Sequence, residues 1–212
     1  MDEIGLKYAF DFAKGKNYKG GDKTSLGFNF TSYYDNLFNK RKNEKLNLLE
    51  LGIFYGKSLA MWSDYFVNGS IYGIDISLKY FYEHESILKK RGAFKNDNIR
   101  LFQYDLTNIE LEHFIQNLPN FDIIIDDANH QPNIQYNNFM LLYNKLNPNG
   151  YYIIEDIIDP VKFFDLFRDL YLCISNKSNS LIKQNKYYKI SIKFDSIEIR
   201  NKMVIFHKAS EI

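Results

Sequence analysis

Short apolar runs alternate with longer amphipathic segments through the centre of the chain. Five runs are rich in β-branched and aromatic residues, as buried parallel strands are, and they span 46–51, 70–76, 99–104, 121–125 and 151–154. Helix-like segments follow the first four runs, at 57–66, 78–90, 108–118 and 132–146. This alternation predicts parallel strands with right-handed helical crossovers. We expect Asn147-Pro148-Asn149-Gly150 to end the fourth helix and turn the chain.

The two ends of the chain do not follow this alternation. After Pro160 we expect a helix over 161–173 and then two strands, 187–194 and 197–207, joined by a tight turn at Asp195-Ser196. The predicted fold class is therefore α/β, with a mostly parallel seven-stranded sheet that ends in an antiparallel C-terminal hairpin. Residues 1–45 predict helices at 4–13 and 30–38 around a polar loop at 17–27. We interpret 1–45 as an N-terminal lid or cap on a domain formed by 46–212, with a simple packing arm as the alternative.

Composition narrows the class of protein only modestly. The 212 residues suffice for one α/β domain with a short extension, and the net charge of +1 argues against a general nucleic-acid or membrane binder. Cys173 is the single cysteine, which excludes an intrachain disulfide and a cysteine metal cluster. No signal peptide and no run of about 18 apolar residues is evident, so we expect a cytoplasmic protein. Acids outnumber bases 15 to 8 within 46–160, the region that carries the candidate chemistry.

A turn with two glycines links the first strand to the first helix. It reads Leu49-Glu50-Leu51-Gly52-Ile53-Phe54-Tyr55-Gly56-Lys57-Ser58. Gly52 allows a close backbone approach to a ligand, and the helix that follows Gly56 begins with free N–H groups, Ser58 lying in its first turn. A dinucleotide site needs three glycines around a pyrophosphate, whereas Glu50 here stands close to the phosphate position. The turn therefore favours a cationic sulfonium cofactor, S-adenosylmethionine (SAM), over a dinucleotide. An ordinary strand–helix turn is the alternative.

Acids also end the second and third predicted strands. Asp75 lies 23 residues after Gly52, near the spacing expected of an acid that accepts the ribose hydroxyls of an adenosine. Asp105 follows the third strand and could accept the adenine amino group. For both acids the alternative is a cap on the helix that follows.

The most informative motif follows the fourth and fifth predicted strands. Asp126 and Asp127 end the fourth strand, and Glu155 and Asp156 end the fifth. These two strands are expected to be neighbours, so their carboxyl ends would bring the acids together. Carboxylates gathered in this way repel one another unless a cation binds them, and oxygen ligands favour Mg²⁺, Ca²⁺ or Mn²⁺.

A histidine stands beside this acidic motif. His130 comes three residues after Asp127, on a loop at the strand ends. Methyl transfer to an alcohol requires loss of its proton, and an imidazole with a pKa near ~6.5 can accept that proton while a metal lowers the pKa of the alcohol. A purely structural histidine is the alternative. His84, His113 and His207 have no comparable surroundings, and we assign them no role.

Together these residues resemble a known family. It comprises the metal-dependent SAM O-methyltransferases of the macrocin and mycinamicin type, which act on sugar hydroxyls of macrolides, and related proteins labelled cephalosporin hydroxylases. The resemblance covers about residues 20 to 160, and its most specific motifs are Ile125-Asp126-Asp127-x-x-His130 and Ile154-Glu155-Asp156. It also includes Gly21-Asp22-Lys23-Thr24-Ser25, Tyr34, Leu49–Gly56, Met61-Trp62, Tyr65-Phe66 and Gly73-Ile74-Asp75. The resemblance implies a Rossmann-like SAM methyltransferase fold.

The resemblance also implies a role for each motif. Asp127, Glu155 and Asp156 would bind Mg²⁺, and His130, beside Asp127, would be the catalytic base. The residues that would hold SAM are Glu50, Gly52, Gly56, Ser58, Asp75, Asp105 and Asp126, with Asp22 and Lys23 closing over it. The chain departs from the family at Gly21, Phe28, Phe30 and Ala128, where threonine, histidine, tyrosine and glycine are common.

We therefore predict a metal-assisted SAM O-methyltransferase that acts on a hydroxyl of a small substrate, a sugar or sugar nucleotide. Two alternatives are a nucleotide-binding Rossmann oxidoreductase and a non-catalytic SAM-fold binding subunit. Glu50 and the missing third glycine argue against the first, and the complete acid and histidine set argues against the second. We expect no nucleic-acid or membrane partner, and a homo-oligomer is compatible with the sequence. The sequence does not name the methyl acceptor.

Overall fold

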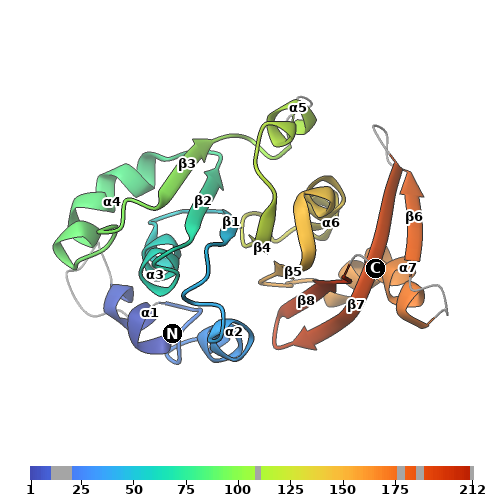
Figure 1. Cartoon of the computed structure of the whole chain (residues 1–212), viewed down its shortest axis with the longest axis horizontal. Coiled ribbons are helices and arrows are strands. Elements are labelled where there is room, and N and C mark those ends of the chain that lie inside the picture. The colour runs from blue at the N-terminus through green and yellow to red at the C-terminus, as the bar shows by residue number, and fades with distance from the viewer. Residues whose placement is uncertain (11–20, 108–110, 176–179, 185–188, 211–212) are drawn as a thin grey trace. The chain divides into compact units, whose positions relative to one another are not determined.

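The chain forms two compact units. The computed structural model describes residues 1–10, 21–107, 111–175, 180–184 and 189–210. One unit comprises Met1–Leu46 and Ile53–Tyr104, and the other comprises Asn47–Gly52 and Asp105–Ile212. Figure 1 colours the chain from blue at the N-terminus to red at the C-terminus and labels the elements. No helix among the described residues is long and apolar enough to cross a membrane.

The first unit contains a pair of parallel strands and four helices. The strands are β2 (Ser70–Asp75) and β3 (Ile99–Gln103), which pair from Ile71↔Ile99 to Asp75↔Gln103. The helices are α1 (Asp2–Tyr8), α2 (Phe30–Phe38), α3 (Lys57–Tyr65) and α4 (Lys79–Lys90). Each element agrees with the sequence prediction except α1, which was expected to continue to residue 13. The alternating apolar pattern therefore located the strands and helices of this unit.

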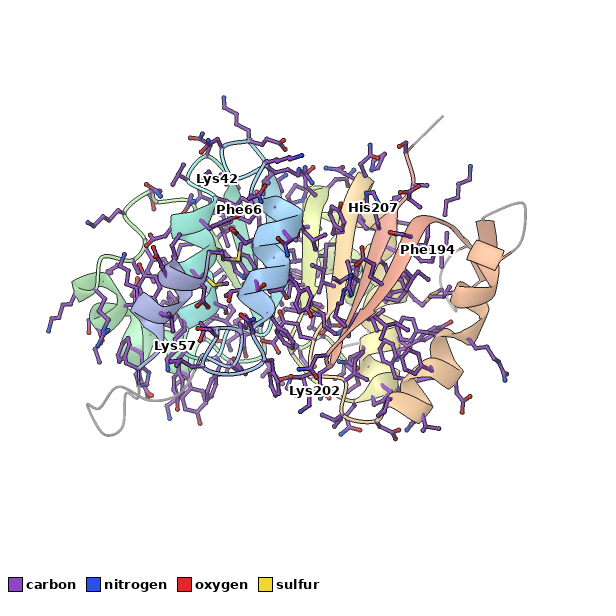
Figure 2. The ribbon with its side chains drawn as sticks, turned by 90° about the horizontal axis from the view of Figure 1, so that it is seen from below. Lys42, Lys57, Phe66, Phe194, Lys202 and His207 are labelled. Carbon is purple, nitrogen blue, oxygen red and sulfur yellow. The ribbon has the colours of Figure 1, made fainter. Side chains whose placement is uncertain are left out.

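The N-terminal helices pack against α3 through buried aromatic rings. The Tyr34 ring meets the Trp62 ring edge-on at 5.0 Å between centroids, and the Phe38 ring lies 6.0 Å from that of Phe66. Figure 2 labels Phe66 beside the helices of this unit. Residues 1–10 and 21–46 thus share a hydrophobic core with α3, and residues 11–20, which hold part of the predicted polar loop, lie outside the described residues. A lid role for 1–45 stays a prediction.

The turn before α2 is anchored by an acid at the N-terminus. Asp2 accepts hydrogen bonds from the backbone N–H and the hydroxyl of Ser25 at 2.9 and 2.6 Å, and from the Thr31 hydroxyl at 2.6 Å. Partial burial raises the pKa of Asp2, but these hydrogen bonds outweigh it, so the pKa lies below the ordinary value of 3.8. The stabilisation is therefore present above about pH 4 and is lost as the pH falls through the lowered pKa.

Replacing Asp2 by alanine should lower the free energy of unfolding at pH 7 by about 1 kcal/mol, a charged hydrogen-bond contribution reduced by solvent screening. The difference from the unmodified chain should vanish below the lowered pKa of Asp2. Urea denaturation at pH 7 and at a series of pH values that decreases from 3.8 measures the loss and the pH at which it vanishes. Glu3→Ala is the matched control, because Glu3 is an exposed acid in the same helical turn. Equal losses for both variants would contradict the anchoring role.

The second unit contains a mixed sheet. In order across the sheet its strands are β1 (Asn47–Leu51), β4 (Phe121–Asp126), β5 (Leu146–Ile154), β8 (Met203–Lys208), β7 (Lys189–Arg200) and β6 (Ser180–Gln184). β1, β4 and β5 pair in parallel, and the last three strands join antiparallel. The pairings confirm the predicted α/β class with its antiparallel C-terminal end. The structure adds an eighth strand, β6, that the sequence did not predict.

Aromatic side chains fill the core between the sheet and the helices of this unit. The helices are α5 (Leu111–Gln116), α6 (Pro132–Leu142), the 3-10 turn η1 (Tyr143–Lys145) and α7 (Pro160–Ser175). The Phe139 ring lies 4.8 Å from that of Phe206 and 5.6 Å from that of Phe167. Phe194, labelled in Figure 2, lies 5.3 Å from Phe206. Part of the high aromatic content of the chain is therefore used in packing.

The predicted hairpin turn at Asp195-Ser196 is wrong. β7 runs through both residues to Arg200, and the chain turns at Asn201-Lys202 before β8. The pairing of β7 with β8 shifts register between Phe194 and Ser196, so Asp195 lies at a bulge rather than a turn. There its carboxylate contacts Nδ1 of His207 at 3.2 Å. An Asp-Ser pair suits a bulge as well as a turn, which explains the error.

The predicted turn at 147–150 lies inside β5 rather than before it. α6 ends at Leu142, and β5 already begins at Leu146, before the Asn-Pro-Asn-Gly segment. The segment interrupts the pairing, since Phe121 pairs with Leu146 but Ile123 pairs with Tyr151. Asn149 has a φ of 59°, as a local turn requires. The segment therefore bends the chain inside a strand instead of preceding it.

Candidate active site

Two paired strands bring the candidate acids together in the second unit. β4 and β5 pair in parallel, with Asp126 opposite Ile154. Just beyond, the Glu155 N–H donates to the Asp126 carbonyl at 3.0 Å. Asp127 and Asp156 are the next residues of their segments, so both lie at the carboxyl ends of neighbouring strands. The expected neighbourhood of the fourth and fifth strands is confirmed.

Asp127, His130 and Asp156 form a compact group of potential cation ligands. One ligand atom from each lies within 4.8 Å of the others. The His130 Nε2 is 3.4 Å from Asp127 Oδ1 and 3.9 Å from Asp156 Oδ2. Atoms that share a cation at bond lengths of roughly 2.1 to 2.6 Å lie within about 5 Å of one another. The spacing and the two carboxylates therefore fit a hard divalent cation.

The neighbouring carboxylates shift the pKa of His130. The hydrogen bond to Asp127 raises the pKa of His130 above 6.5; partial burial opposes the rise, and the charges of Asp127 and Asp156 add to it. The imidazolium is therefore favoured as long as both carboxylates carry their full charge. A cation held by these carboxylates would offset their charge and lower the pKa of His130 again.

Asp156 adopts an unusual backbone conformation. Its φ is 50°, in the left-handed region that residues with a side chain seldom occupy. Such a conformation costs of the order of 1 kcal/mol and persists where the surroundings enforce it, often at functional sites. The strain falls on one of the three residues of the ligand group. This agrees with a site whose geometry matters more than its local stability.

Asp126 and Glu155 lie deeper than the ligand group. Asp126 is fully buried, and its Oδ2 accepts a hydrogen bond from Asn138 Nδ2 at 3.0 Å. Burial raises the pKa of Asp126 to about 7, against the effect of the Asn138 hydrogen bond. Glu155 is 1% exposed and is not part of the three-residue group. The cofactor role of Asp126 and the metal-ligand role of Glu155 stay predictions.

Gly52 lies directly against the Asp127 segment. Its φ is 89°, and a Cβ atom at this position would collide with the Asp127 carbonyl oxygen and lie 2.8 Å from the Ala128 Cα. The Asp127 N–H also donates to the Leu51 carbonyl at 3.0 Å. From the sequence, we expected Gly52 to let the backbone come close to a ligand. In the structure, the backbone of Asp127 and Ala128 lies close to Gly52. The glycine therefore shapes the segment that carries Asp127.

Replacing Gly52 by alanine should destabilise the fold by more than its φ alone explains. A left-handed alanine costs about 1–2 kcal/mol, and the collision with Asp127 adds roughly 1–3 kcal/mol. Gly92→Ala is the matched control, because Gly92 has a φ of 86° but its nearest neighbour is the flexible Lys95 side chain at 3.4 Å. Guanidinium denaturation of both variants measures the two losses. If Gly92→Ala lowers the free energy of unfolding as much as Gly52→Ala does, the contact between position 52 and the Asp127 backbone does not add to the loss.

In the first unit, the Asp75 side chain holds the turn that follows Gly52. Asp75 Oδ2 accepts hydrogen bonds from the Ile53 and Phe54 N–H groups at 2.7 and 2.9 Å, and Oδ1 accepts from the Ser77 N–H at 3.0 Å. α4 has no side-chain cap, so Asp75 does not cap that helix. Phe54 has a φ of 46° and an exposed ring. The turn is thus fixed by the acid that the sequence assigned to a ribose.

The remaining predicted cofactor residues have varied surroundings. Glu50 is fully buried in β1, and Asp105 accepts hydrogen bonds from the N–H and hydroxyl of Thr107, which lower its pKa. Gly56 has a φ of 78° and precedes α3, whose first turn contains Ser58. The Lys23 N–H donates to Asp22 Oδ1 at 3.0 Å, and Lys23 is buried. The cofactor roles of these residues stay predictions.

Two buried amides next to the ligand group were missed. Gln135 and Asn138 lie on α6 and are 0% and 1% exposed. They occupy the same helical stripe as Phe139 and Leu142, because residues three and four apart share a face. A polar side chain within an otherwise apolar stripe was the signal that could have revealed them.

Comparison with known proteins identifies the class. A family model described as a methyltransferase domain matches residues 49–157, about half of the chain, so the chain belongs to this methyltransferase family. The matched region contains the Gly52 turn, Asp75 and the complete Asp127, His130 and Asp156 group. The resemblance seen in the sequence is therefore confirmed.

Particular relatives are O-methyltransferases by name. The chain is 33% identical over 136 residues to mycinamicin VI 2''-O-methyltransferase of Micromonospora griseorubida, covering 60% of this chain and 31% of the relative. It is 31% identical over 143 residues to the 8-demethyl-8-(2-methoxy-alpha-L-rhamnosyl)-tetracenomycin-C 3'-O-methyltransferase of Streptomyces olivaceus, covering 64% of this chain and 34% of the relative. The chain thus spans about a third of the length of these relatives.

A solved structure shows the same fold. The MycE methyltransferase of the mycinamycin biosynthetic pathway, in complex with Mg, SAH and mycinamycin VI, matches with a TM-score of 0.70 and 23% identity. The match covers 99% of this chain and 54% of that protein. At this identity the likeness shows the fold, which is the predicted Rossmann-like methyltransferase fold.

Proposed function

We propose that this protein is a SAM-dependent, divalent-metal-assisted O-methyltransferase that acts on a hydroxyl of a small substrate, a sugar or sugar nucleotide. The observation that carries the proposal is the group of Asp127, His130 and Asp156 at the ends of β4 and β5. Membership of a methyltransferase family supplies the reaction class, and the ligand group supplies the means to activate a hydroxyl. A cytoplasmic location and a homo-oligomer stay predictions.

The three residues divide the work of activating the hydroxyl. Asp127 and Asp156 would hold Mg²⁺ or a similar hard cation, with buried Glu155 as the predicted third acid. Such a cation, when bound, lowers the pKa of a hydroxyl and orients its oxygen. His130 Nε2 would accept the hydroxyl proton, while the oxygen takes the methyl group from the sulfonium of SAM and leaves S-adenosylhomocysteine (SAH).

The cofactor assignment rests on the turn around Gly52 and on the acids of the sequence motifs. Glu50, Gly52, Gly56, Ser58, Asp75, Asp105 and Asp126 are the proposed SAM residues, with Asp22 and Lys23 closing over the cofactor. Asp75 supports this role best, because its carboxylate fixes the Ile53–Phe54 amides in the turn. Such pre-organised polar groups are the usual means of holding a cofactor in this class of fold.

A sugar acceptor is suggested by the names of the relatives. One of them carries out 3'-O-methylation of a rhamnosyl-tetracenomycin, and the structural neighbour was solved with mycinamycin VI and Mg. A sugar offers neighbouring hydroxyls that a single cation can bind together, which agrees with the carboxylate pair. We therefore propose a glycoside or sugar nucleotide rather than an isolated alcohol.

A SAM-consumption screen tests the proposal. The protein is incubated with SAM and a panel of sugar nucleotides and free glycosides, with Mg²⁺ or with EDTA, and SAH is measured. The expected result is SAH formation with at least one sugar acceptor that EDTA abolishes. SAM binding without SAH formation would favour the non-catalytic subunit, and NAD binding without SAM binding would favour the oxidoreductase. SAH formation that survives EDTA would contradict the metal-assisted part.

A further inference from the structure

Two buried amides on α6 hold the two strand ends that carry the ligand group. Gln135 and Asn138 are three residues apart, so they lie on one face of the helix. Gln135 Nε2 donates to the Glu155 carbonyl at 3.0 Å, at the end of β5. Asn138 Nδ2 donates to Asp126 Oδ2 at 3.0 Å, at the end of β4. One helical turn therefore contacts both segments that carry the ligand acids.

The Gln135 contact acts on the strained residue of the group. The Glu155 carbonyl belongs to the peptide plane that joins Glu155 to Asp156. The angle φ of Asp156 is a rotation about the bond between this plane and its own Cα atom. A hydrogen bond that fixes the plane therefore helps to keep Asp156 at its φ of 50°, which this residue would not choose alone. Gln135 thus sets the direction of the Asp156 side chain.

The Asn138 contact acts on the other strand end. The Asp126 side chain is fully buried, and the Asn138 amide supplies it with a hydrogen-bond donor in the interior. Asp126 immediately precedes Asp127, so a fixed Asp126 side chain fixes the point from which Asp127 emerges. The Ala128 N–H also reaches Asp126 Oδ1 at 3.5 Å. Asp126 is in this way a link between α6 and the Asp127 segment.

Each amide also has a buried oxygen that lowers the stability of the fold. Among the described residues, Gln135 Oε1 and Asn138 Oδ1 are buried polar atoms without a hydrogen-bond partner. A buried acceptor left unsatisfied costs about 1–3 kcal/mol, whereas an apolar side chain of similar shape would carry no such cost. An apolar replacement would remove this cost but would leave Asp126 Oδ2 or the Glu155 carbonyl without its amide donor, which costs a similar amount. The amides are better explained by what they hold in place.

We propose that Gln135 and Asn138 are positioning residues that set the spacing of Asp127 and Asp156 and thereby the affinity of these two acids for a divalent cation. The inference rests on the proposed function, because it assumes that the group binds such a cation. Outer residues that orient metal ligands typically change metal affinity by 10- to 100-fold when they are replaced.

Mn²⁺ binding followed by electron paramagnetic resonance at 10 °C tests the proposal directly. We expect Gln135→Met and Asn138→Leu each to weaken Mn²⁺ binding by about 10-fold. Asn137→Leu is the matched control, since Asn137 is an exposed asparagine on the same helix and should leave the affinity unchanged. Each buried variant leaves a buried acceptor without its amide donor, so both should be somewhat less stable than the unmodified chain. Urea denaturation of the metal-free proteins should show that both are nevertheless folded under the conditions of the titration, so that a weaker affinity does not reflect unfolding.

A double replacement provides a rescue. Asp126→Asn combined with Asn138→Asp exchanges the two partners, so that the amide at 126 donates to the carboxylate at 138. We expect this variant to bind Mn²⁺ within about threefold of the unmodified chain, although each single replacement binds more weakly. The rescue also covers the case in which Asn138→Leu does not fold.

The outcomes distinguish this inference from the proposed function. An unmodified chain that binds no Mn²⁺ at millimolar concentration would overturn both. If the unmodified chain binds Mn²⁺ and the folded Gln135→Met and Asn138→Leu variants bind it equally well, only the positioning role is overturned. An unrescued double variant would overturn the role of the Asn138–Asp126 pair.

Discussion

An Asp127→Asn variant is expected to lose methyl transfer by about 10³-fold and to bind divalent cations much more weakly. The substitution keeps the size of the side chain but removes one of the two carboxylate charges in the ligand group. Charge stabilisation by a bound cation is worth several kcal/mol in such reactions, and each 1.36 kcal/mol corresponds to a tenfold change in rate. SAH formation at saturating SAM measures the rate, and Mn²⁺ titration measures the affinity.

Asp159→Asn is the matched control for this variant. Asp159 lies three residues beyond Asp156 and accepts a hydrogen bond from the Lys162 N–H at 3.0 Å, which asparagine can preserve. It lies outside the ligand group and should leave both measurements unchanged. SAM binding should persist in both variants. An Asp127→Asn variant that retains its Mn²⁺ affinity would contradict the assignment of the metal site.

His130→Gln is expected to lower kcat by roughly 10²- to 10⁴-fold, the usual contribution of a general base. Mn²⁺ and SAM binding should remain, because the two carboxylates are intact. The unmodified chain should show a rate that rises with pH, since His130 accepts a proton only when it is neutral. Asp127 raises the pKa of His130 in the metal-free protein, and a cation held by the carboxylates would reduce this shift, so the profile is measured with Mg²⁺ present. The rise should be missing in the variant.

His113→Gln controls for the loss of an imidazole. His113 is an exposed residue of α5, outside the ligand group. Its replacement should change neither kcat nor the pH profile. If His130→Gln keeps the full rate, or if its rate still rises with pH in the same range, another group accepts the proton.

The regular part of the fold could be predicted from apolar periodicity. The ranges of β2, α3 and α4 follow from short apolar runs and a helical stripe, because burial on one or both faces dictates those patterns. Errors arose where polar residues sit inside strands. Asp195 lies at a bulge in β7, and the Asn-Pro-Asn-Gly segment lies within β5, although both look like turns in the sequence. Local turn propensity does not reveal that a strand continues on both sides.

The placement of the candidate site could be predicted from the sequence, but the burial of its residues could not. Adjacent strand ends placed Asp127 and Asp156 together, since parallel neighbours end at one edge of a sheet. The sequence gives no direct measure of burial, so it did not separate half-buried Asp156 from buried Glu155. It also left Gln135 and Asn138 unnoticed, because their importance lies in contacts with Glu155 and Asp126 far along the chain.

The proposed methyltransferase activity requires, before anything else, that this chain binds SAM. Calorimetric titration of the purified protein with SAM, and separately with SAH and NAD, measures this without knowledge of the acceptor. We expect saturable binding of SAM and SAH with one site per chain, and no binding of NAD. Absence of SAM and SAH binding by the folded protein, with or without Mg²⁺, would contradict the proposed methyltransferase activity.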